Sequence, residues 1–70
     1  MDYYEAFEMI KIKLRHSCRQ DVIEGANVCG DTYDRWSNGL VIKPSLATFV
    51  KFCIYYELEV GVADLKELLT

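Results

Sequence analysis

Helix-breaking residues at two places constrain the fold most: the GAN stretch at 25–27 and the NG pair at 38–39. Asparagine is one of the few residues other than glycine that tolerates a left-handed backbone, so the first stretch predicts a tight turn. Between the two breaks there is room for one short helix, predicted from about 30 to 37. Before the first break we expect another short helix over 18–25, with Ser17 as its cap.

The N-terminal residues predict a longer amphipathic helix from Tyr3 to Arg15. Its acidic residues come in the first half and its basic residues in the second, which suits the helix dipole. Apolar side chains recur at spacings of three and four, the pattern of a helix with one buried face. These side chains are Tyr4, Phe7, Ile10 and Leu14.

After the second break, a loop over 40–43 leads to Pro44, which suits the first position of a new helix. The apolar residues that follow form one broad face, so we expect a long, well-buried helix. The segment FVKFCIYYELEV (49–60) is also rich in β-branched and aromatic residues, as strands are, but its spacing and the helix-start signal favour a helix. The segment ADLKELL (63–69) predicts a fifth helix.

The expected fold class is therefore all-α, with five short helices in a single domain over residues 1–70. At 51% hydrophobic residues, such a chain can form one modest core. No apolar run reaches the roughly 18 residues that a membrane span needs. Acidic residues precede the basic ones at the N-terminus, the wrong order for a signal peptide, so we expect a cytoplasmic protein.

The titratable residues give little support to a metal site or to catalysis. Cys18, Cys29 and Cys53 are 11 and 24 positions apart and His16 is the single histidine, which matches no zinc pattern. Reduced, partly buried thiols are expected instead. No phosphate-binding glycine loop or catalytic triad can be inferred, so we expect neither an enzyme nor a cofactor.

Charge is distributed unevenly along the chain. The net charge is −3, but residues 1–10 and 57–70 each carry −3, whereas residues 11–51 hold seven bases against four acids, a net charge of +3. An acidic protein can still present one basic face to a polyanion. The charge balance therefore argues against non-specific nucleic-acid binding while leaving one basic face possible.

The run VIEGANVCGDTYDRWSNG (22–39) resembles, without a gap, the helix-turn-helix motif of the phage repressor family (Cro/CI-type, also called XRE). That family's usual run is Leu-Ala, two variable residues, Leu-Gly-Val-Ser, two variable residues, then Thr-Ile-Ser-Arg-Trp-Glu-Asn-Gly. The segments KPSLATFVKF (43–52) and DLKELL (64–69) resemble its following "KPSLETLLKI" and its closing "SLDELL". The resemblance covers nearly the whole chain and implies a lambda-repressor-like fold.

The resemblance also implies a function and a set of contact residues. The helix after the turn would lie in the major groove of operator DNA, and the start of the helix before it would point at a phosphate. Two such proteins would bind as a homodimer, with the seam expected in IYYELEV (54–60). A chain without a second domain would resemble a Cro-type regulator of phage or mobile-element origin. The implied DNA-binding residues are Arg19, Gln20, Gly30, Asp31, Thr32, Asp34, Arg35, Asn38 and Lys43.

Trp36 and Tyr33 occupy positions that pack against neighbouring helices in the family, so both are expected in the core. The sequence departs from the family at two positions of the motif. Ile23 stands where the family usually has a small residue, and Asn27 stands where it usually has the turn glycine. Asp31 and Asp34 replace neutral or basic residues on the reading helix. A carboxylate can accept a hydrogen bond from the amino group of cytosine, but its negative charge weakens the attraction of the protein to the DNA phosphates.

These carboxylates leave a second function open. The fold could serve a protein-binding modulator, or antirepressor, whose acidic second motif helix pairs with the basic DNA-binding surface of another transcription regulator.

Overall fold

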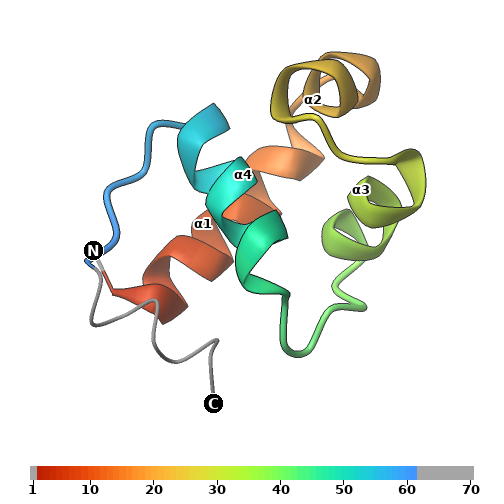
Figure 1. Cartoon of the computed structure of the whole chain (residues 1–70). Helices are drawn as coiled ribbons and strands as arrows, with labels where there is room; N and C mark the ends of the chain where they lie inside the picture. The colour runs from red at the N-terminus through yellow and green to blue at the C-terminus, as the bar shows by residue number, and fades with distance from the viewer. Residues whose placement is uncertain (1, 62–70) are drawn as a thin grey trace.

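The computed structural model describes residues 2–61, which form four α-helices and no strand (Figure 1). The helices are α1 (Tyr3–Arg15), α2 (Arg19–Ala26), α3 (Gly30–Ser37) and α4 (Leu46–Tyr55). The all-α class is confirmed for this part of the chain, with four helices rather than five. The predicted fifth helix at 63–69 lies outside the described residues. No helix within residues 2–61 is long and apolar enough to cross a membrane.

α1 begins at Asp2, whose carboxylate accepts the backbone N–H of Glu5 at 2.8 Å and caps the helix. Its buried face is made by Tyr3, Ala6, Phe7, Ile10 and Leu14. Tyr4 was expected in this stripe and is instead 65% exposed. Tyr3 and Tyr4 both lie three or four positions from Phe7, and the structure places Tyr3 on the core side.

Ser17 does not cap α2, contrary to the sequence prediction. Its hydroxyl donates to the carbonyl of Lys13 at 2.6 Å and lies 2.8 Å from the hydroxyl of Tyr56. The hydroxyl is therefore engaged at the end of α1, and the N-cap of α2 is Cys18, whose side chain makes no capping hydrogen bond. Burial raises the pKa of Tyr56, and the hydrogen bond with Ser17 acts in the opposite direction.

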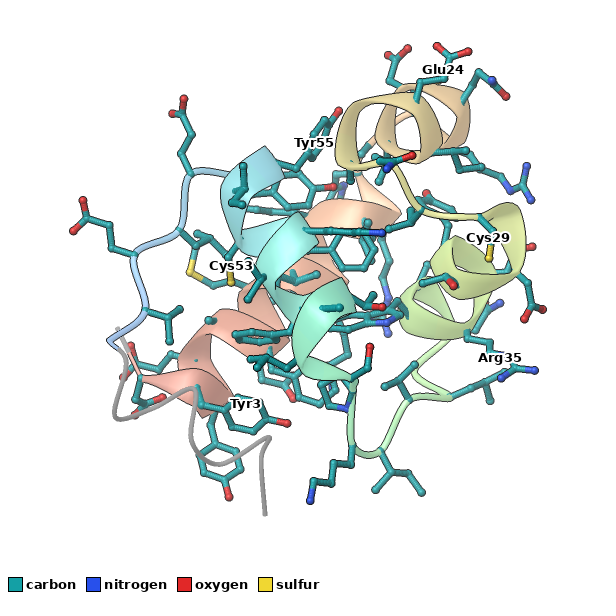
Figure 2. The ribbon with its side chains drawn as sticks, in the orientation of Figure 1. Tyr3, Glu24, Cys29, Arg35, Cys53 and Tyr55 are labelled. Carbon is teal, nitrogen blue, oxygen red and sulfur yellow. The ribbon has the colours of Figure 1, made fainter. Side chains whose placement is uncertain are left out.

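α4 confirms the helix prediction over the strand alternative for most of 49–60. The expectation that Pro44 is its first residue is wrong, because Ser45 is the N-cap and accepts the N–H of Thr48 at 3.3 Å. Pro44 therefore stands one position before the cap, where it is buried. At the other end, the ring of Tyr55 reaches α2 (Figure 2), and a Cβ added to Gly25 would meet it.

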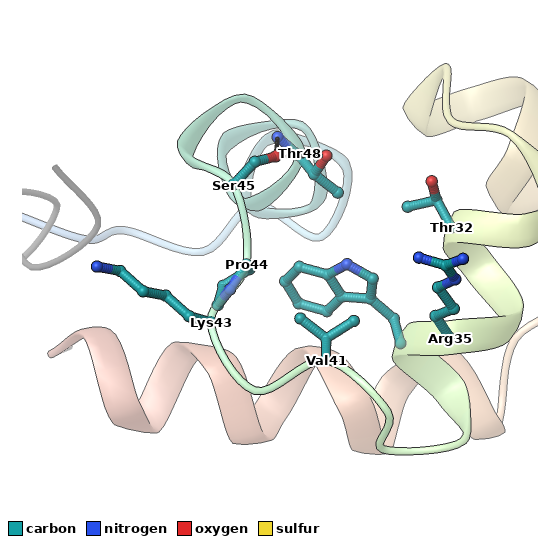
Figure 3. Close-up of a pocket in the computed structure, with 8 residues that line it drawn as sticks. Thr32, Arg35, Val41, Lys43, Pro44, Ser45 and Thr48 are labelled. Atoms are coloured by element: carbon teal, nitrogen blue, oxygen red, sulfur yellow. Dashed lines mark hydrogen bonds between the residues drawn. The ribbon is translucent and has the colours of Figure 1, made fainter.

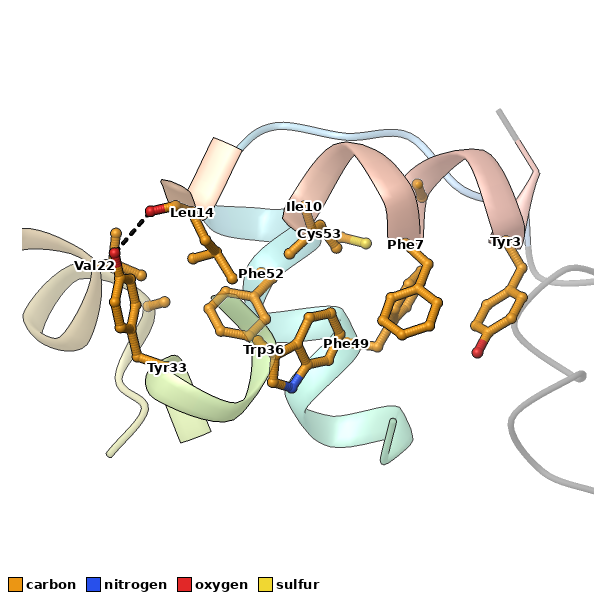
Figure 4. Close-up of a cluster of buried hydrophobic side chains, with 12 residues drawn as sticks. Tyr3, Phe7, Ile10, Leu14, Val22, Tyr33, Trp36, Phe49, Phe52 and Cys53 are labelled. Carbon is orange, nitrogen blue, oxygen red and sulfur yellow. Dashed lines mark hydrogen bonds between the residues drawn. The ribbon is translucent and has the colours of Figure 1, made fainter. Parts of the chain in front are cut away.

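The core lies between the four helices, with Val22 and Ala26 as the part that α2 contributes (Figure 4). Trp36 is 2% exposed, with its ring edge-on to Phe7 at 5.2 Å and tilted against Phe52 at 4.8 Å between centroids. Tyr33 is also buried, and its hydroxyl donates to the carbonyl of Leu14 at 2.7 Å. The predicted core positions of Trp36 and Tyr33 are confirmed, and together they fix α3 to the rest of the molecule.

Candidate nucleic-acid interface

α2, a three-residue turn and α3 form a compact unit on one side of the α1–α4 pair, called here the α2–α3 unit (19–37) (Figure 1). Asn27 ends α2 in the left-handed conformation (φ 57°, ψ 50°), as the sequence predicts. The turn is held on both sides, since Val28 donates its N–H to Ile23 at 3.2 Å and Lys51 of α4 donates to the Asn27 carbonyl at 3.1 Å. The turn thus has one defined geometry.

α3 has two distinct faces. Tyr33 and Trp36 point into the core. The opposite face carries Asp31, Asp34 and Arg35, all of them exposed. Residues three and four apart share a helix face, so the predicted reading positions lie on one surface. This surface is the part of α3 that a partner molecule can reach.

Arg19 begins α2 and forms a two-pronged ion pair with Asp34 of α3. Its Nε lies 3.1 Å from Oδ1, and its terminal nitrogen donates to Oδ2 at 3.3 Å. The guanidinium also lies 6.0 Å from the centroid of the Tyr33 ring. Hydrogen bonding to Asp34 and its charge raise the pKa of Arg19. The cation predicted to meet a phosphate is therefore already paired with a carboxylate.

Gly30 lies directly against this ion pair. A Cβ at this position would meet the terminal nitrogen of Arg19, the flexible end of a half-exposed side chain, which would have to move aside. The predicted role of Gly30 in direct DNA contact stays a prediction.

Arg35, labelled in Figure 2, also pairs with a carboxylate, that of Asp31 one turn earlier on α3. The Nε–Oδ2 distance is 3.1 Å, and the two side chains are 66% and 71% exposed. The α2–α3 unit holds two arginines against Asp21, Glu24, Asp31 and Asp34, so its net charge is −2. Both arginines of the predicted interface thus have their charge offset by aspartates of α3.

The other predicted contact residues are spread around this surface. Gln20 donates to Glu24 at 2.9 Å on the outer side of α2, and Asn38 caps α3. The hydroxyl of Thr32 lies 3.1 Å from Sγ of Cys29, the N-cap of α3. This hydrogen bond lowers the pKa of the exposed Cys29 thiol, whereas burial raises the pKa of Cys53. The expectation of partly buried thiols therefore holds for Cys53 alone, since Cys18 and Cys29 are exposed.

A surface pocket of about 160 Å³ lies between α3, the loop that follows it and the start of α4 (Figure 3). It brings together three predicted residues, Thr32, Arg35 and Lys43. Sequence reasoning missed its other polar members, Ser45 and Thr48. The spacing of these two hydroxyls around the start of α4 was a usable signal, because the N-cap residue and the third helical residue lie side by side.

A scan of protein-family models, a search of curated proteins and a search of solved structures found no match to this chain.

Proposed function

We propose that the protein is a small Cro/CI-like transcriptional regulator with a lambda-repressor-like fold that binds operator DNA through the α2–α3 unit. One observation carries the proposal: α3 is anchored by Tyr33 and Trp36 on one side and presents its predicted reading residues on the other. An exposed, rigidly held helix that follows a fixed turn suits insertion into the major groove.

The proposal includes a homodimer, because the eight residues of α3 can contact only a few base pairs. Two copies on half-sites about 34 Å apart, one turn of the duplex, would double the number of contacts. Within the predicted seam at 54–60, Ile54 is 73% exposed, while Leu58 and Val60 pack against the core. Ile54 is therefore the side chain of this segment best placed to meet a second copy.

The direct test is a selection from random duplex DNA with the purified protein, at moderate and at low salt. We expect enrichment of a short motif with two-fold symmetry. The double variant Arg19→Gln with Lys43→Gln should then lose most of its operator affinity. Lys11→Gln with Lys13→Gln removes the same charge from α1 and should bind nearly as the wild type does. A folded protein that enriches no sequence at either salt concentration would exclude the proposal.

A specific observation favours a second candidate function, the binding of another regulator. Arg19 and Arg35 are each paired with an aspartate, and the α2–α3 unit carries a net charge of −2. A surface of this sign complements the basic DNA-binding face of a different protein. If the DNA selection fails, binding to such a protein becomes the leading function, and substitution of Asp31 and Asp34 by lysine should abolish it.

A further inference from the structure

The pocket between α3 and α4 has the composition of an anion site. Two cations, Arg35 and Lys43, line it together with the hydroxyl residues Thr32, Ser45 and Thr48. No carboxylate lines it within the part of the chain that the structure describes. Its volume holds several water molecules, since each needs about 10–15 Å³ of such space, so a compact tetrahedral oxyanion fits.

Trp36 adds a donor from the core side of the pocket. The residue is 2% exposed and lines the pocket, and Figure 4 shows its indole nitrogen at the side of the core away from α1. Within residues 2–61 no buried side-chain nitrogen or oxygen lacks a hydrogen-bond partner, so the indole N–H, which has no partner there, is not sealed in the core. It opens into the pocket that Trp36 lines, where a bound ligand can serve as its acceptor.

At the start of α4, the hydroxyl of Thr48 keeps its proton available to a ligand. Ser45 and Thr48 lie side by side at the pocket (Figure 3). Ser45 gives its proton to the oxygen of Thr48 at 2.9 Å and accepts the Thr48 backbone N–H, so the Thr48 hydroxyl does not need its own proton for this contact. The positive end of the α4 dipole lies at the same place. Arg35 uses Nε for Asp31, and its guanidinium has further N–H groups. Several donors therefore converge on one small volume.

We propose that this pocket binds a phosphate group, with the Trp36 N–H as its central donor. Phosphate offers four acceptor oxygens and a negative charge, which match the two cations and the hydroxyl donors around the pocket. The group belongs either to the DNA backbone or to a free phosphate compound. The first source rests on the proposed function, and the second does not.

The experiment follows the indole N–H of Trp36, which is the single tryptophan and gives one resonance in a ¹H–¹⁵N spectrum. Inorganic phosphate should shift this resonance saturably, and chloride at equal ionic strength should not. Lys43→Gln and Thr48→Val should each weaken binding about tenfold, the cost of one charge-assisted hydrogen bond. Lys13→Gln, on α1 and outside the pocket, is the control.

The same resonance identifies the source of the phosphate. If selected DNA shifts it and competes with inorganic phosphate, the pocket holds a backbone phosphate. If phosphate binds and DNA neither competes nor shifts the signal, the ligand is a free phosphate compound, and this outcome stands even where no DNA binds. If neither phosphate nor DNA gives a saturable shift that the two variants weaken, the proposal is overturned.

Discussion

Single residues explain why α3 is held so firmly. The ring of Tyr33 lies in the core, as the sequence predicts. Its hydroxyl adds a hydrogen bond that an apolar side chain could not make, to the carbonyl of Leu14 in the last turn of α1. Carbonyls in a last turn lack partners within their own helix, so this bond ties α3 to the end of α1.

Tyr33→Phe tests this contact. The ring stays in place, and the variant loses the hydroxyl's hydrogen bond to the carbonyl of Leu14 at 2.7 Å and its longer one to the carbonyl of Ser17 at 3.4 Å, so we expect the free energy of unfolding to fall by about 1 kcal/mol. Thermal or urea unfolding measures the change. Tyr4→Phe is the matched control, because Tyr4 is 65% exposed, and its stability should stay within error of the wild type. Equal losses in the two variants would contradict this role for Tyr33.

The helices themselves were largely predictable from sequence because local signals set their ends. Asn27 stops α2, and the periodicity of α4 outweighs its β-branched composition. The capping prediction for Ser17 failed because the residue has a partner that is distant in sequence. Its hydroxyl contacts the hydroxyl of Tyr56 instead of capping α2. The pairing of Arg19 with Asp34 links residues 15 positions apart, so it depends on how α2 and α3 pack.

The contact between α2 and α4 gives a prediction at this scale. Gly25 lies inside α2, where alanine would be favoured by about 1 kcal/mol, but the Tyr55 ring occupies the place of a Cβ. Gly25→Ala alone should therefore lower stability. In a Tyr55→Ala background the same change should raise stability by up to about 1 kcal/mol. Chemical unfolding of the wild type, the two single variants and the double variant measures the coupling between the two positions. If the two effects are additive, the Tyr55 ring is not the reason that position 25 is a glycine.

At the scale of the whole molecule, the distribution of charge sets the conditions for the proposed DNA binding. The sequence places the basic residues in the middle of the chain, but it does not show that Asp31 and Asp34 take up the two arginines of the α2–α3 unit. A net charge of −3 further limits general attraction to a polyanion. Binding should therefore rely on a few specific contacts and depend weakly on salt.

Asp31→Asn combined with Asp34→Asn releases both arginines while keeping the side-chain shapes. We expect tighter non-specific DNA binding, and the slope of log affinity against log salt should steepen by about 0.9 for each further phosphate that the protein neutralises. Fluorescence anisotropy over a salt series measures both. Glu5→Gln with Glu8→Gln makes the same change in net charge on α1 and should have a much smaller effect. If the aspartate variant binds DNA no better and loses a protein partner, the second candidate function is supported.

Trp36 closes the aromatic core with one edge of its indole and lines the phosphate pocket with the other. In a genetic screen, this position would return loss-of-function alleles for two unrelated reasons, reduced protein abundance and reduced ligand affinity. Second-site suppressors would separate them: those that restore abundance should map to the hydrophobic core, and those that restore affinity should add positive charge beside Lys43. The position therefore leaves natural variants little freedom to change one property without changing the other.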